Sequence, residues 1–126
     1  MANQTNIEAR CAHYGSRIVE NKNQAGKGPE RLETIARNAL GVLREDGLFA
    51  FYLFLRYRWG EGGDVIWSQI KALWGHDALG PLIGTGPDRR EVIELTESLP
   101  DLLLAREATE RALVYALYGL RSERGS

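Results

Sequence analysis

The sequence predicts an all-α protein, a single-domain bundle of about six helices around a buried central apolar helix. Apolar residues recur at the three- and four-residue spacing of a helix along most of the chain. Only one segment has strand-like aromatic content, and a lone strand would leave its backbone hydrogen bonds unpaired. A length of 126 residues with 44% hydrophobic composition is that of one globular domain. We therefore expect residues 1–126 to form a single helical domain.

The first two helices follow from their apolar stripes. Apolar residues spaced 4, 3 and 4 apart predict a helix that starts near Asn6, with Thr5 or Asn6 as its N-cap. This first stripe consists of Ile7, Cys11, Tyr14 and Ile18. Residues 21–29 contain glycine and proline and predict a loop. A second helix is expected over residues 30–44, with the stripe Leu32, Ile35, Ala36, Ala39, Leu40 and Leu43.

The next segment, from Leu48 to about Trp59, is apolar on nearly every side, with the sequence LFAFYLFLRYRW. Asp46, before Gly47, is expected to cap it. Its aromatic content also suits a strand, but the chain offers no second strand to pair with it. Because a helix that is apolar all round is a buried one, we expect this segment to be the central helix.

A glycine-rich stretch, Gly60 to Gly63, predicts a turn after this helix. Asp64 is then expected to cap a helix over residues 64–74. Residues 75–87 contain four glycines and two prolines, so they form the longest predicted loop.

Two helices complete the chain. Asp88 is expected to cap a short helix over residues 88–98, and Pro100 to lie in the first turn of a last helix that reaches about Ser122. Small residues in the last stripe should let a neighbouring helix approach closely: Ala105, Ala108, Ala112 and Ala116.

Charge divides unevenly along the chain, although 16 basic and 17 acidic residues leave a total of only −1. That total argues against a free-standing strong nucleic-acid binder, which would be visibly basic. Residues 1–58 carry nine bases and six acids, a charge of +3, and residues 59–126 carry seven bases and eleven acids, a charge of −4. Such asymmetry can indicate an anionic partner. Arginine outnumbers lysine 13 to 3. This excess is typical of phosphate-binding proteins, but codon bias explains it equally well.

The sequence shows no spacing of cysteines, histidines or carboxylates that is typical of a catalytic or metal-binding site. Cys11 is the only cysteine, which excludes an internal disulfide, suggests a reducing compartment and fits a buried thiol. With His13 and His76 as the only histidines, a tetrahedral Cys/His site cannot be assembled. The closely spaced carboxylates fit surface ion pairs: Glu91, Glu94, Glu97, Glu107 and Glu110. We expect no enzyme activity, no metal and no cofactor.

We expect the protein to be cytoplasmic and to have no membrane partner. The first residues are polar and lack the pattern of a targeting segment. The longest apolar run, residues 48–55, is far shorter than the ~20 residues of a membrane helix.

Arginines form two ridges at helical spacing. Arg10, His13 and Arg17 share one face of the first helix, and Arg37 and Arg44 share one face of the second. Two such ridges on adjacent helices could follow a phosphate backbone, whereas the alternative is an ordinary solvated surface.

The order of features resembles a known family. Asp46-Gly47-Leu48 is followed by the apolar run from Phe49 to Leu55, and a Trp-rich helix comes next. The chain closes with the sequences REATERAL, from Arg106, and YGLR, from Tyr118. This pattern is similar to that of the small helical subunit of the type III-B (Cmr) CRISPR effector complex. The departures are Asp46 for Asn, Ala105 for Tyr, Arg111 for Glu and Tyr118 for Trp.

The resemblance implies an all-α, non-catalytic subunit whose copies stack as an inner filament against the Cmr backbone subunits. Such a subunit helps to hold the duplex of CRISPR RNA and target RNA, while neighbouring subunits cut. Arg106 and Arg121 match basic positions of the family's closing motif. The expected RNA-binding residues are therefore Arg10, His13, Arg17, Arg37, Arg44, Arg106 and Arg121.

Two other functions remain open. A helical protein–protein adaptor without a nucleic-acid role would use the Trp-rich helix and exposed aromatic residues as its surface. A small helical enzyme would need a pocket with perturbed carboxylates among Glu91, Glu94 and Glu107.

Overall fold

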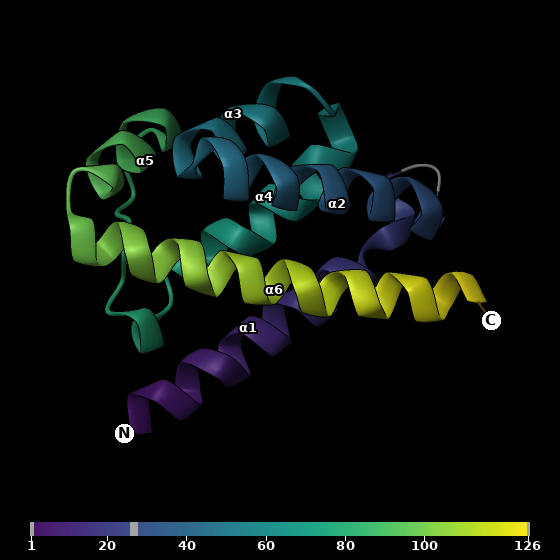
Figure 1. The fold of residues 1–126 in the computed structure, drawn as a ribbon, viewed down its shortest axis with the longest axis horizontal. Coiled ribbons are helices and arrows are strands. Elements are labelled where there is room, and N and C mark those ends of the chain that lie inside the picture. Colours follow the sequence, from purple (N-terminus) through teal and green to yellow (C-terminus); the bar gives the residue numbers. More distant parts are fainter. Residues whose placement is uncertain (1, 26–27, 126) are drawn as a thin grey trace.

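The computed structural model describes residues 2–25 and 28–125, and these form an all-helical bundle in one compact domain (Figure 1). The described residues contain no strand, so the predicted all-α class with six helices is confirmed. Two short 3₁₀ helices, η1 and η2, interrupt the connections. The elements are α1 Ala2–Glu20, η1 Lys22–Ala25, α2 Gly28–Asp46, α3 Leu48–Tyr57, α4 Gly60–Trp74, η2 Asp77–Leu79, α5 Asp88–Thr96 and α6 Leu99–Gly125.

Helix α6 spans the length of the molecule and separates α1 from α2. In Figure 1, α2 runs along one side of α6 and α1 crosses its other side; each makes its most extensive contacts with α6. A Cβ atom at Gly15 would lie 2.6 Å from the carbonyl oxygen of Ala112, and one at Gly119 would lie 2.7 Å from Val19 Cγ2. The predicted close approach along the alanine stripe of α6 is therefore confirmed, and the helix that approaches is α1.

The segment predicted as the central helix forms α3, but its expected central position is wrong. One face of α3 is buried through residues such as Phe51 and Leu55, whereas Phe49 and Leu53 are only partly buried. The core is centred instead on α4, whose side chains are buried along most of its length, including Trp67 and Trp74. The difference arises because α2, α4 and α5 pack against α3 but leave part of its surface only partly covered.

A buried hydrogen bond and a glycine contact fix the position of α4. The indole N–H of Trp74 donates to Thr109 Oγ1 at 2.8 Å, and both residues are completely buried. At the other end of α4, the backbone at Gly63 packs directly on the carbonyl group of Leu55, which leaves no room for a side chain. These contacts join α4 to α6 and to α3.

Several predicted N-caps are wrong. Helix α1 begins at Ala2, so Thr5 and Asn6 lie within the helix rather than before it. Helix α4 begins at Gly60, so the predicted turn at residues 60–63 is its first turn, and Asp64 pairs with Arg56 at 2.6 Å.

The N-caps predicted at Asp46 and Asp88 are also wrong. The N-cap of α3 is Gly47, with φ +96°, and Asp46 is instead the last residue of α2. Asp88 is the first residue of α5, where its carboxylate accepts from Trp67 Nε1 at 3.0 Å and pairs with Lys71 at 2.7 Å. Asp64 and Asp88 thus bind side chains on other helices, which spacing along the sequence does not show.

The predicted loops are more ordered than expected. Part of the 21–29 loop forms η1 and the start of α2, and its residues 26–27 lie outside the described part of the chain. The 75–87 loop contains η2, which His76 caps by accepting from the backbone N–H of Ala78 at 2.9 Å. Pro100 lies in the first turn of α6, as predicted.

Candidate nucleic-acid interface

The ridge of Arg10, His13 and Arg17 lies on the side of α1 away from α6. Gly15, which packs against Ala112 of α6, lies on the opposite side of α1, and the completely buried Cys11 and Ile18 lie beside the ridge. His13 and Arg17 are exposed and Arg10 is half-buried. Neither arginine forms an ion pair with any described residue, so both cationic groups are free to bind an anion.

The second group of predicted arginines is bound to the chain itself. Arg44 pairs with Glu110 at 3.3 Å, and Arg106 donates to the backbone oxygen of Leu43 at 3.4 Å. These contacts join α2 to α6. Because surface ion pairs contribute only about 0–1 kcal/mol, they reduce the availability of these guanidinium groups without removing it.

Glu33 holds the remaining two predicted arginines. Arg121 Nε lies 3.4 Å from Glu33 Oε2, and Arg37 Nη1 lies 3.7 Å from the same oxygen. The Glu33 side chain is only 4% exposed, so this carboxylate is a buried anchor between α2 and α6. We infer that Arg37 and Arg121 serve first to satisfy this buried charge.

The two predicted ridges are not on adjacent helices. Since α6 lies between α1 and α2, the first ridge faces a different side of the molecule from the arginines of α2 (Figure 1). The sequence contains an indication of this arrangement. Gly15 on α1 is a small residue of the kind that can pack closely against the alanine stripe of α6, as it does against Ala112. The expectation of one continuous basic face on neighbouring helices is wrong.

The charge division between the two halves of the chain also does not become two faces. Ion pairs link the basic half to the acidic half across the bundle, because α6 of the acidic half packs between α1 and α2 of the basic half. The linking pairs that involve α6 are Lys22–Glu123, Arg44–Glu110, Glu8–Arg111 and Glu33–Arg121. A further pair, Arg56–Asp64, joins α3 to α4.

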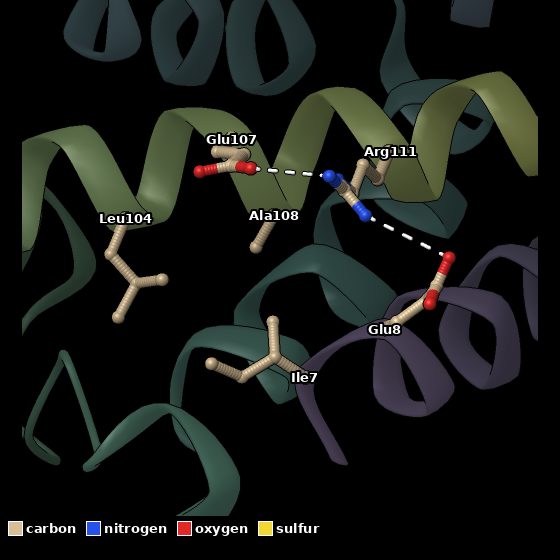
Figure 2. A pocket seen from close by; sticks show the side chains of 6 residues that line it. All are labelled: Ile7, Glu8, Leu104, Glu107, Ala108 and Arg111. Atoms are coloured by element: carbon tan, nitrogen blue, oxygen red, sulfur yellow. Dashed lines mark hydrogen bonds and ion pairs between the residues drawn. The ribbon is translucent and has the colours of Figure 1, made fainter. Parts of the chain in front are cut away.

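A small pocket of about 200 Å³ lies between α1 and α6 (Figure 2). Its apolar lining consists of Ile7, Leu104 and Ala108. Arg111 stands at its rim and pairs with Glu107 at 3.3 Å and with Glu8 at 3.8 Å. The charged groups of the rim therefore bind one another rather than point together at the cavity.

The carboxylates that an enzyme would need are not gathered in this pocket. Glu107 lines it, but its side chain is 66% exposed and paired with Arg111. Glu91 and Glu94 lie on α5, where Glu91 accepts from the backbone N–H of Gly84 at 2.7 Å. Among the residues that the structure describes, no group of three or more His, Cys, Asp or Glu residues could hold a metal ion.

Cys11 is the buried thiol that its position predicts. Its side chain is completely buried against the core. Burial raises the pKa of the thiol to about 11, and nearby Arg111 lowers it only in part. A thiol that stays protonated in this way is a poor nucleophile and a poor metal ligand.

A second cationic cluster, absent from the sequence-based set, lies where α3 turns into α4. The guanidinium carbon of Arg31 lies 4.8 Å from the centre of the Trp59 ring, and that of Arg58 lies 5.7 Å from it. We call these three residues the Trp59 corner. The sequence shows only that Arg58 precedes Trp59. The third member, Arg31, comes from α2, and only the tertiary structure shows that it lies near the ring.

Comparison with known proteins finds no family model that matches the chain, and no significant match among curated proteins or solved structures. None of the described helices combines the length and the apolar character that crossing a membrane requires.

Proposed function

We propose that this protein is a non-catalytic, RNA-contacting subunit of a type III-B (Cmr) CRISPR effector complex or a close relative. Two features support the proposal. The ordered motifs from Asp46 to Arg121 resemble the small helical subunit of that complex. The observation that carries the RNA contact is the outward ridge on α1, where Arg10 and Arg17 have no ion-pair partner among the described residues.

The ridge is suited to a weak, repeated phosphate contact. Arg10 and Arg17 are seven residues apart, which corresponds to about 10 Å along a helix. Two cations per copy give a small counterion-release contribution, because affinity grows steeply with the number of phosphates neutralised. Several copies in one assembly would add their contacts through effective concentration. A monomer with a net charge of −1 suits this role.

The adaptor alternative has its own supporting feature, but not the one expected. Trp67 and Trp74 of the Trp-rich helix are buried, so they cannot form a docking surface. Leu99 and Leu103, one turn apart on α6, are 64% and 54% exposed. A pair of exposed leucines favours a protein contact, which both an adaptor and a complex subunit would make.

Copurification distinguishes the two functions. The chain, tagged and expressed in its own host, is purified at low salt, and the bound proteins and nucleic acid are analysed. A type III subunit should bring other effector subunits together with a small RNA of defined length. Partner proteins without RNA would support the adaptor, and a chain that purifies alone would contradict the proposal.

A further inference from the structure

The Trp59 corner is a pair of arginines held against one indole ring. Arg31 comes from the first turn of α2, whereas Arg58 and Trp59 come from the connection between α3 and α4. In Figure 1 the start of α2 and this connection lie in the same half of the molecule as the C-terminal half of α6. Phe54 packs edge-on against Trp59, with ring centres 5.9 Å apart.

Neither arginine of the corner is neutralised. Both Arg31 and Arg58 are exposed, and neither forms an ion pair within 4.0 Å of a described acid. Glu30 and Glu61, the acids nearest to them in sequence, do not pair with them. By contrast, the neighbouring Arg56 is paired with Asp64 at 2.6 Å. The corner therefore presents two free guanidinium groups.

Trp59 acts as a platform for these groups. Its ring is half-buried, and its indole N–H is buried without an acceptor among the described residues. Packing, rather than a hydrogen bond, therefore holds the ring. A guanidinium group stacked on an aromatic face keeps its N–H edge free to donate, and it loses less side-chain freedom when it binds an anion. Two such groups on one ring are preorganised for phosphate.

We propose that the Trp59 corner binds the phosphate backbone of single-stranded RNA, as a second contact separate from the α1 ridge. This inference rests on the proposed function, because that function supplies the RNA. Single strands are favoured since an unpaired base can stack on an exposed arginine plane, whereas a paired base cannot. A protein partner with an acidic surface is the other occupant that the test can reveal.

The test measures binding of a fluorescent oligouridylate to the full chain between about 50 and about 200 mM salt. The first variant, Arg31→Gln with Arg58→Gln, removes both charges. Two lost phosphate contacts should lower the salt slope by about 1.4 and weaken binding on the order of twentyfold at about 0.1 M salt. The second variant, Arg31→Lys with Arg58→Lys, keeps the charges but loses the planar guanidinium groups that lie over the ring. It should keep the salt slope and still bind several-fold more weakly.

Matched controls come from another arginine pair. Arg89, which lies over Phe49 at 5.7 Å, and Arg90 are exposed and are not ion-paired with a described residue. The same Gln and Lys changes at these two positions should leave binding close to that of the natural chain. Thermal unfolding of each variant should confirm that the fold is retained.

Each other outcome decides against a specific claim. Equal binding by the Lys variant and the natural chain would overturn the platform role of Trp59. Unchanged binding by the Arg31/Arg58 Gln variant, with loss in an Arg10/Arg17 variant, would overturn the corner and leave the proposed function standing. Unchanged RNA binding with loss of copurifying proteins would assign the corner to a protein partner. No RNA binding by the natural chain, alone or in its complex, would overturn both proposals.

Discussion

Replacement of Gly15 by alanine tests the packing that orients the α1 ridge. Gly15 lies between His13 and Arg17, on the side of α1 that faces α6. An added Cβ would lie 2.6 Å from the carbonyl oxygen of Ala112 and 3.1 Å from Tyr115 Cβ. Ordinary contacts between such atoms are about 3.5–4 Å. The two helix backbones would therefore have to separate by about 1 Å.

The expected magnitude combines two opposing effects. Overpacking costs about 1–3 kcal/mol, and the cost here should be about 2–3 kcal/mol because the atom in the way is a backbone oxygen that cannot rotate aside. Alanine is favoured over glycine in a helix by about 1 kcal/mol. We expect Gly15→Ala to lower the free energy of unfolding by about 1–2 kcal/mol. For a domain of this size, the melting temperature should fall by roughly 3–10 °C.

Gly41 provides the matched control. It lies within α2, is exposed and has no heavy atom within 4 Å of an added Cβ. Gly41→Ala should therefore raise the free energy of unfolding by about 0.5–1 kcal/mol. Thermal and urea unfolding followed by circular dichroism measure both variants. A Gly15→Ala protein as stable as the natural chain would refute the close contact of α1 with α6, and with it the orientation of the ridge.

Two further predictions concern the core. Thr109→Val should lower the free energy of unfolding by about 1–3 kcal/mol, because it leaves the buried Trp74 indole N–H without its acceptor. Thr109→Ser, which keeps the acceptor, should cost less in the same urea titration; equal losses would show that packing alone matters. Because the pKa of Cys11 is raised to about 11 from 9.0, the thiol ionises first in the unfolded chain. Its contribution to stability should be complete below pH ~9 and decline by roughly 3 kcal/mol as the pH rises to ~11, so that the decline of the Cys11→Ala protein should be smaller by that amount. The same pH dependence in both proteins would contradict this burial.

The sequence predicted the helices well because their signal is local. The stripes of Ile7 to Ile18 and of Leu32 to Leu43 repeat at helical spacing, and their buried faces are those expected. The N-caps predicted at Asp64 and Asp88 are wrong because these carboxylates bind side chains on other helices. The central helix was misplaced because the apolar character of a segment does not show how many layers cover it.

The candidate site was predictable only in part. The ridge on α1 depends on spacing within one helix, so it could be derived from the sequence. Its relation to Arg37 and Arg44 depends on which helices are neighbours, and this follows from the three-dimensional order of α1, α6 and α2. The Trp59 corner joins residues 27 positions apart along the chain, Arg31 and Arg58, through a ring at the end of the segment that the sequence predicts to be buried.

The most direct test of the central claim is target-RNA binding by the complex purified through this chain. The variant carries Arg10→Glu and Arg17→Glu, and the control carries Arg89→Glu and Arg90→Glu, which change the net charge equally. Subunit composition and melting temperature are checked first for both. We predict that the α1 variant binds target RNA at least about tenfold more weakly at about 0.1 M salt, with a shallower salt dependence, while the control remains close to the natural complex. Equal binding by the two variants would contradict the proposal that α1 contacts RNA.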